Sequence, residues 1–442
     1  MAHIFRGRPG AATSAAIALF FVLSSLLAGC SQPAATPGPP PSGGWTHQLG
    51  SPEDDWAYSL LVDSEGNVVM AGTQGLSIGV PPSEKIGGFL ARYDGQGKQL
   101  MSRLFQTPQV AAPNNAFVRR ALVDGNGNYY LAGWTDDAPS LQRPSANVDA
   151  FLTKYDISGK ELWTSEFGSS GQDWIFGMAV DGAGNVYVGG RTDGALSGQQ
   201  LLGKRDAFIM KFDGSGKELW ARQFGSPEED WVLTLAADAA GNVYGAGGTL
   251  GQLLSGQASS GQEDAFFVKY DGQGKALWTR QLGSSENDRA LSLVVDGAGN
   301  LYGAGWTGGV LPKQQTSGKR DAFLVKYDGQ GKDVWTRQFG SSEDDEGQGV
   351  ALDSAGNAYI SGSAKAALPG RSASGLEDAF VAKFDGRGLE LWASQFGSFM
   401  TDMASNVAVD GAGAVYAAGQ TWGALPGERA SGLVDAFLIK IE

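Results

Sequence analysis

Acidic residues recur along this chain at regular intervals, and three of them stand directly before a tryptophan. The recurring residues are Asp55, Trp56, Asp173, Trp174, Asp230, Trp231, Asp288, Asp345 and Asp402. A carboxylate beside an indole ring suits a bound cation or a sugar ring stacked on the indole. Two nearby carboxylates can also hydrolyse a glycosidic bond when their pKa values differ. A plainer interpretation stays open, in which the tryptophans pack between repeats and the acids keep the surface soluble.

Other catalytic groups are scarce. His3 lies in an N-terminal leader, so His47 is the single histidine of the remaining chain, and Cys30 is the only cysteine. A Ser-His-Asp triad, a zinc cluster or a cysteine nucleophile with its histidine therefore cannot be assembled. No D-x-D-x-D-G loop is present, so we expect no metal and no other cofactor, with Ca²⁺ as the weaker alternative. The sequence favours a non-catalytic binding scaffold over the alternative, a polysaccharide lyase or hydrolase that uses the recurring carboxylates.

The N-terminus has the layout of a secretion signal. Basic residues precede an apolar run at 15–27, and the sequence L-A-G-C follows, ending at Cys30. This tetrapeptide resembles the bacterial lipobox, in which the cysteine is lipidated and becomes the new N-terminus. The resemblance implies a signal peptide at 1–29, a lipid on Cys30 and a Pro/Gly-rich tether over 30–44. Ser31 follows the cysteine where an aspartate would imply retention at the inner membrane, so the resemblance implies the outer membrane or cell surface of a Gram-negative host. The alternative to the lipoprotein interpretation is a plain signal peptide that is cut elsewhere.

The rest of the chain is built from repeats. An element of the type W-T-R-Q-F-G recurs seven times at intervals of 56 to 62 residues, starting at Trp45, Met101, Trp163, Trp220, Trp278, Trp335 and Trp392. One unit holds four short segments rich in β-branched and aromatic residues, at 290–296, 300–307, 321–328 and 333–340. Four strands per unit are typical of propeller blades. We therefore predict an all-β fold, a single seven-bladed β-propeller of four-stranded antiparallel blades over residues 45–442.

Three motifs of these units, D-G-x-G-N-x-Y, D-A-F-x-x-K-Y-D-G-x-G and W-x-x-Q-x-G-S, resemble the SBBP family of bacterial β-propeller repeats. The resemblance extends from Trp45 to Glu442. It implies the propeller fold and an extracellular or surface location, without one shared activity.

The first and last repeat units are incomplete, and each has the segment that the other lacks. The first unit begins with a lone W-T-H-Q-L segment, and the last ends with D-A-F-L-I-K-I-E, which no W-T-R-Q-F segment follows. We therefore predict that residues 45–49 form the outer strand of the last blade. This closure would remove an exposed sheet edge.

Strand direction predicts which loops share a face. Because successive strands alternate in direction, the two Asp/Gly turns of each unit lie on one face, and the two longer loops, with the recurring acids, lie on the other. The formal net charge of −14 disfavours nucleic acid as a partner. We expect a monomer that contacts the membrane through its lipid and takes a protein or carbohydrate ligand on the longer loops.

Loops that depart from the repeat predict where a partner docks. Val110 lies in T-P-Q-V-A-A-P-N-N, and Phe399 and Met400 lie in S-F-M-T-D, where other units carry acids. Ring closure would bring these loops into one sector of the longer-loop face. An apolar docking sector is the hypothesis, and drift in a tolerant loop is the alternative.

Overall fold

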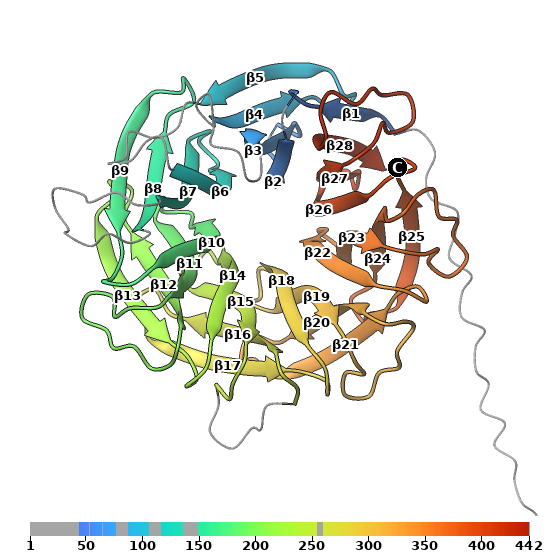
Figure 1. Ribbon diagram of the computed structural model, residues 1–442. Coiled ribbons are helices and arrows are strands. Elements are labelled where there is room, and N and C mark those ends of the chain that lie inside the picture. Colours follow the sequence, from blue (N-terminus) through green and yellow to red (C-terminus); the bar gives the residue numbers. More distant parts are fainter. Residues whose placement is uncertain are drawn as a thin grey trace, which may run out of the picture. The chain divides into compact units, whose positions relative to one another are not determined.

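The computed structural model describes residues 44–52, 54–63, 65–76, 87–105, 116–135, 149–253 and 260–441. Every regular element in these ranges is a β-strand, and 28 strands form seven four-stranded antiparallel sheets arranged in a ring (Figure 1). The predicted seven-bladed β-propeller is confirmed. No helix of the described residues is long and apolar enough to cross a membrane. The residues of the predicted signal peptide, Cys30 and most of the predicted tether lie outside the described residues.

Six blades each take four consecutive strands, from the centre of the ring to its rim. Blades 1 to 3 are β2 (Asp54–Val62), β3 (Val68–Leu76), β4 (Gly87–Tyr93), β5 (Gln99–Phe105); β6 (Ala116–Val123), β7 (Tyr129–Thr135), β8 (Asp149–Tyr155), β9 (Glu161–Phe167); and β10 (Asp173–Val180), β11 (Val186–Thr192), β12 (Asp206–Phe212), β13 (Glu218–Phe224). Blades 4 to 6 are β14 (Asp230–Ala237), β15 (Val243–Thr249), β16 (Asp264–Tyr270), β17 (Ala276–Leu282); β18 (Asp288–Val295), β19 (Leu301–Thr307), β20 (Asp321–Tyr327), β21 (Asp333–Phe339); and β22 (Asp345–Leu352), β23 (Ala358–Ala364), β24 (Asp378–Phe384), β25 (Glu390–Phe396).

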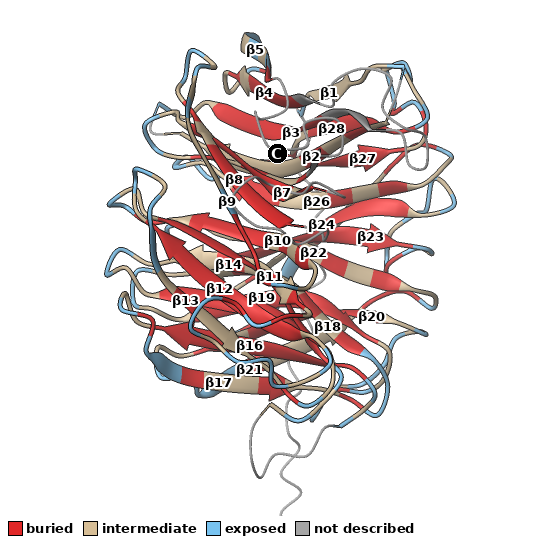
Figure 2. Cartoon of the chain, turned by 60° about the vertical axis from the view of Figure 1, so that its left-hand side comes forward, coloured by how far each residue is buried: buried red, intermediate tan, exposed pale blue. Residues whose placement is uncertain are grey.

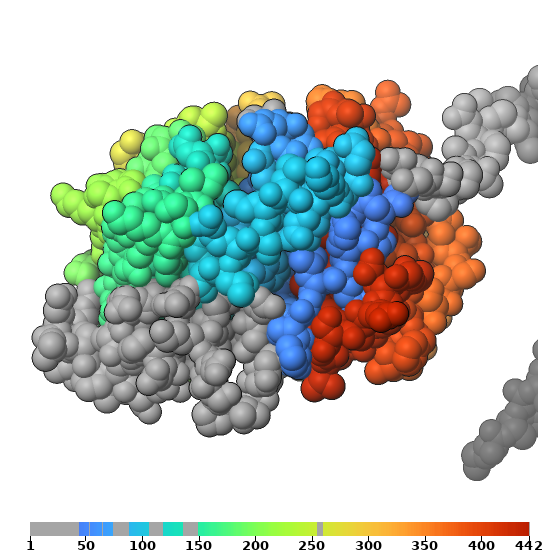
Figure 3. Space-filling model, turned by 90° about the horizontal axis from the view of Figure 1, so that it is seen from above, coloured from blue at the N-terminus to red at the C-terminus, as the bar shows by residue number. Residues whose placement is uncertain are grey.

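Blade 7 joins the two ends of the chain, as predicted. Its strands are β26 (Asp402–Val409), β27 (Val415–Thr421), β28 (Asp435–Ile441) and β1 (Thr46–Leu49). β1 runs antiparallel to β28, with Thr46 opposite Ile439 and Leu49 opposite Ala436. In Figure 3 the earliest described residues, in blue, lie between the red C-terminal strands and the lighter blue strands of blade 1. The N-terminal strand therefore covers the edge that β28 would otherwise expose.

The core lies between neighbouring blades. Middle strands such as β15 and β16 are buried along their whole length, because blades pack on both of their faces, whereas the outer β17 is partly exposed (Figure 2). One cluster joins Tyr244 and Phe267 of blade 4 to Leu301 and Phe323 of blade 5. Each interface of this kind stabilises the ring through apolar burial.

Asp/Gly turns fix the short joints. In the turn between β18 and β19, the Asp296 carboxylate accepts hydrogen bonds from the backbone N–H groups of Ala298 and Asn300, at 3.0 and 2.9 Å. Gly299 adopts a φ of +80°, which glycine tolerates without a steric penalty. The repeated D-G-x-G-N motif thus encodes a tight hairpin.

Every inner strand carries a register shift against its neighbour, at the same place in each blade. In β6, for example, Val118 pairs with Gly133 and Arg120 with Ala132, which leaves Arg119 without a partner position. A bulge of this kind turns two successive side chains toward one side of the sheet. In the propeller that side is the centre of the ring.

Candidate functional site

Two sets of loops form one face of the ring, which we call the loop face. One set joins second and third strands, as at 193–205, and the other leads into the next inner strand, as at 225–229. Parallel bridges tie the two sets together at blade junctions, between Arg205 and Glu229, Arg320 and Asp344, and Glu377 and Thr401. The hairpin turns lie on the opposite face.

The six recurring acids that the sequence placed on the ligand-binding face are buried. Asp55, Asp173, Asp230, Asp288, Asp345 and Asp402 are 0–2% exposed. Each accepts a hydrogen bond from the backbone N–H of a serine four residues earlier, at 2.6–2.7 Å, as Asp173 does from Ser169. The expectation that these carboxylates face a ligand is corrected, because they hold the loop that precedes their own strand.

Acids at the heads of the third strands act in the same way. Asp206 accepts hydrogen bonds from the backbone N–H groups of Leu202 and Gly203, at 2.7 and 2.9 Å, and from the side-chain amide of Gln223. The recurring D-A-F aspartate thus holds the loop that leads into the third strand.

The two kinds of acid meet beneath a glycine at four junctions of the described residues, at Gly168, Gly225, Gly340 and Gly397. A Cβ on Gly340 would lie 2.9 Å from Asp321 Oδ1 and closer still to Asp345 Oδ2. Burial raises the pKa of Asp345 to about 7, opposed by hydrogen bonds from Ser341 and assisted by the charge of Asp321. Burial likewise raises the pKa of Asp173 and of Asp288 to about 6. These carboxyl groups therefore titrate near neutral pH inside the protein.

Tryptophans beside the acids are occupied by the protein's own side chains. The Trp174 ring lies 4.3 Å from the guanidinium of Arg191, and Trp231, 9% exposed, lies 5.3 Å from that of Arg289. Trp56 packs edge-on against Trp422, with ring centroids 6.0 Å apart. The expected role of Trp56, Trp174 and Trp231 as open stacking platforms is corrected, since Trp174 is covered by an arginine of its own blade and the other two pack against the neighbouring blade.

The apolar docking sector predicted from Val110, Phe399 and Met400 lies only partly within the described residues. Phe399 is 72% exposed on the loop face, whereas Met400 is half-buried, and its backbone carbonyl accepts a hydrogen bond from the backbone N–H of Leu376 at 3.0 Å. Leu376 and Leu433, which the sequence argument missed, are 67% and 79% exposed. Val110 lies outside the described residues. Phe399, Leu376 and Leu433 are the three most exposed large apolar side chains of the described chain.

Leu376 and Leu433 could have been found by aligning the repeats. Both stand two residues before a third-strand aspartate, where blades 3 and 5 carry Lys204 and Lys319. Those lysines form ion pairs across their blade junctions, with Glu228 at 2.6 Å and with Glu343 at 2.5 Å. At the junction of blades 6 and 7, the corresponding positions hold Leu376 and Met400. One junction thus exchanges an ion pair for two apolar residues.

A second departure lies at the rim of blade 1. Among the described residues, five tryptophans in or directly before an outer strand donate the indole N–H to a glycine carbonyl in the next blade, as Trp220 does to Gly272 at 3.1 Å. Met101 stands at this place in β5. A cavity of about 490 Å³, lined by Met101, Leu90 and Ile157 among others, lies there between blades 1 and 2.

His47, the one histidine of the described residues, has a structural contact. Its Nε2 lies 2.6 Å from the carbonyl oxygen of Gly97 in blade 1. The arginine two residues after the tryptophan in blade 3, Arg222, makes the equivalent bond to Gly274. His47 therefore helps to close the ring.

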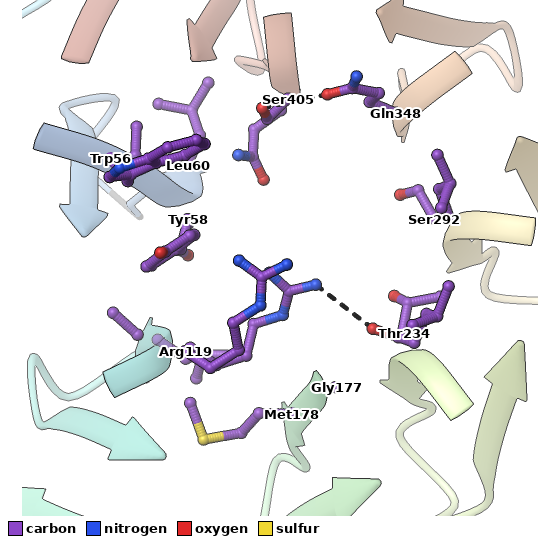
Figure 4. Close-up of a pocket in the computed structure, with 18 of the residues that line it drawn as sticks. Trp56, Tyr58, Leu60, Arg119, Gly177, Met178, Thr234, Ser292, Gln348 and Ser405 are labelled. Carbon is purple, nitrogen blue, oxygen red and sulfur yellow. Dashed lines mark hydrogen bonds between the residues drawn. The ribbon is translucent and has the colours of Figure 1, made fainter. Parts of the chain in front are cut away.

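The centre of the ring holds a channel that the sequence argument did not identify. It has a volume of about 470 Å³ and is lined by the inner strands of all seven blades (Figure 4). The Arg119 side chain extends from β6 toward its middle, facing Ser292 and Gln348 across the ring. Its signal was the pair R-R in the inner strand of blade 2, where no other inner strand has two adjacent cations.

Known proteins share the repeat. SBBP β-propeller repeats match the chain at residues 44–73, 162–196, 277–312 and 334–368, which confirms the predicted repeat type. The regulatory protein FlaEY of Caulobacter vibrioides is 32% identical over 173 residues, 36% of this chain and 18% of that protein. An uncharacterized WD repeat-containing protein, L264, of Acanthamoeba polyphaga mimivirus is 26% identical over 31% of this chain and 12% of its own length. The chain thus spans less than a fifth of either relative.

Solved structures with a similar arrangement include the WD40 domain of Neurospora crassa Pan2. It is 11% identical, with a TM-score of 0.47 over 89% of this chain and 95% of that domain. The β-propeller domain of the Trilobed protease from Pyrococcus furiosus has a TM-score of 0.45 and 9% identity, over 87% and 93% of the two chains.

Proposed function

With SBBP β-propeller repeats as its building units, we propose that this chain is a non-catalytic binding scaffold whose loop face docks a protein partner. The observation that carries the proposal is the junction of blades 6 and 7, where Leu376 and Met400 replace the ion pair found at the junctions that follow blades 3 and 5. Phe399 stands beside Met400, and Leu433 follows one blade further on. We call these four residues the apolar sector.

Exposure favours a partner for this sector. Scattered single apolar residues on a surface need no explanation, but neighbouring loops that each expose a large side chain are typical of an interaction site. Ion pairs at other junctions, such as Lys319 with Glu343, supply a polar rim around such a centre. A protein interface with an apolar core and a polar rim fits this arrangement better than a sugar, which takes hydrogen bonds.

The experiment restores the regular junction. A chain with Leu376→Lys and Met400→Glu should fold normally, because blades 3 and 5 tolerate this pair, and should lose partner capture from envelope extract. Leu202→Lys, which removes an exposed leucine of the loop face in blade 3, is the matched control and should retain it. Equal capture by the double variant and the wild type contradicts the proposal.

The lipid anchor completes the proposal. Lipidation of Cys30 would hold the propeller at the outer membrane or cell surface, where a docking face meets envelope proteins. Cells that express the chain should incorporate labelled palmitate into it and retain it in the membrane fraction. Cys30→Ser should abolish both, and palmitate labelling of this variant would overturn the assignment.

A polysaccharide lyase or hydrolase gains no support from the loop face. The acids that suggested it are buried and hydrogen-bonded to their own loops. Release of reducing ends from a panel of polysaccharides by the purified chain would contradict the non-catalytic proposal.

A further inference from the structure

The central channel differs in charge from the rest of the molecule. The chain has 47 acidic and 33 basic residues, yet none of the described residues that line the channel is acidic. Arg119, Arg120 and Arg289 are its charged groups. A cavity lined by one sign of charge concentrates ions of the opposite sign.

Two of these arginines have no counter-ion among the described residues. Arg289 pairs with Glu263 at 2.5 Å, but Arg120 donates only to the backbone carbonyls of Phe176 and Leu233, the latter at 3.4 Å. Arg119 makes no hydrogen bond or ion pair with the described residues, and its guanidinium lies 5.7 Å from the centre of the Tyr58 ring. Burial, assisted by the charge of Arg119, lowers the pKa of Arg120 to about 10, so the Arg120 guanidinium stays charged at neutral pH.

The arginine pair is specific to blade 2. At the two positions of the bulge, blades 4 and 5 carry Leu233 with Thr234 and Leu291 with Ser292. The bulge directs two successive side chains into the channel. In blade 2 these are Arg119 and Arg120, so two cations that repel one another lie side by side in the channel. The propeller needs no cation at this place, because the other bulges close the same ring with neutral residues.

We propose that the central channel is a binding site for an oxyanion, the phosphate or carboxylate group of a small solute held between Arg119 and Arg120. Two adjacent guanidinium groups present forked donors that match the paired oxygens of either group. Tyr58, Leu233 and Leu291 supply an apolar wall, and the volume of about 470 Å³ accommodates a small molecule. This site is separate from the apolar sector on the loop face.

Titration calorimetry of the full chain in mild detergent tests the site. Sodium phosphate and sodium glucuronate are the two probes, each at an ionic strength fixed with sodium chloride. We expect saturable binding of at least one probe, and the stronger one identifies the group that the site prefers. Binding of neither probe overturns the proposal.

Charge-matched variants locate the binding. Arg119→Gln should weaken it by about tenfold or more, since a hydrogen bond to a charged group is lost. Arg387→Gln removes the same charge from an exposed turn on the opposite face and should leave it unchanged. Undiminished binding by Arg119→Gln, or an equal loss in both variants, overturns the assignment.

A stability readout separates a ligand site from a structural role. Arg119→Leu installs the residue of blades 4 and 5 and removes the repulsion within the pair, so its melting temperature without anion should exceed that of the wild type. Phosphate or glucuronate should raise the melting temperature of the wild type and not that of the variant. A lower melting temperature of Arg119→Leu without anion would show that Arg119 serves the fold.

Discussion

Blades 3 to 5 and blades 1, 2, 6 and 7 have the same four strands and differ at a few positions. The first group carries the rim tryptophans Trp220, Trp278 and Trp335, ion pairs at its junctions, and neutral residues at its bulges. In the second group Met101 replaces a tryptophan, Arg119 and Arg120 occupy a bulge, and Leu376 with Met400 replaces an ion pair. Both groups share the four-stranded blade, so the residues that recur maintain the ring, and the proposed binding sites lie where the sequence departs from the repeat.

Loss of the closing strand should have the largest effect on stability. Deletion of residues 45–49 exposes the edge of β28 and removes the contacts of Trp45 with Gly95 and of His47 with Gly97. We expect the melting temperature, followed by circular dichroism, to fall by about 10 °C or more. Deletion of residues 38–42 is the control for chain shortening, and an unchanged melting curve would contradict closure by β1.

Gly340→Ala should destabilise the ring by about 1–3 kcal/mol, because its Cβ meets the carboxylates of Asp321 and Asp345. Gly297→Ala is the control, since a Cβ there meets no atom within 4 Å. Urea unfolding measures both. Equal stability of the two variants would contradict the close approach of the paired acids.

Stability should depend on pH through the buried acids. The pKa of Asp345 is raised from 3.8 to about 7 in the folded state, so the folded state binds the proton more tightly than the unfolded state. The stability from this group is fully present below pH 3.8 and is lost as the pH rises through 7. The wild type should therefore melt at a higher temperature at pH 5 than at pH 8.

Asp345→Asn removes this dependence at one junction. It should stabilise the chain by about 1–3 kcal/mol at pH 8, an advantage that shrinks at pH 5. Asp344→Asn is the control, because a hydrogen bond from Lys365 lowers the pKa of Asp344. If the melting temperature of Asp345→Asn changes with pH as much as that of the wild type, Asp345 is not the group that titrates.

Filling the rim of blade 1 should have the smallest effect. Met101→Trp restores the regular residue in the cavity between blades 1 and 2, and we expect a gain of about 1 kcal/mol. Trp220→Met makes the reverse change in blade 3 and should be destabilising, since the bond to Gly272 is lost. Equal and opposite changes would show that rim positions are interchangeable between blades.

The fold followed from the sequence because strand length, turn chemistry and repeat phase all pointed to one architecture. The burial of Asp173 could not be predicted in the same way, because the position of an acid in a loop sequence does not show whether the loop backbone covers its carboxylate. The spacing of Ser169 and Asp173, repeated at five other junctions, was the visible signal. The charge of the channel could not be predicted from strand patterns. These patterns assume that successive side chains alternate between the two faces of a sheet, and the bulge that directs Arg119 inward breaks this alternation.

Because β1 pairs with β28, the two ends of the ring lie next to each other in blade 7. Lys440 donates its backbone N–H to the carbonyl of Trp45 at 2.9 Å, so the two ends of the ring meet where other blades have an Asp/Gly turn. A five-residue turn such as 328–332 would make blade 7 continuous, and the ring would then tolerate circular permutation at any hairpin. The offset by one strand is a way to build a closed circle from a linear tandem array.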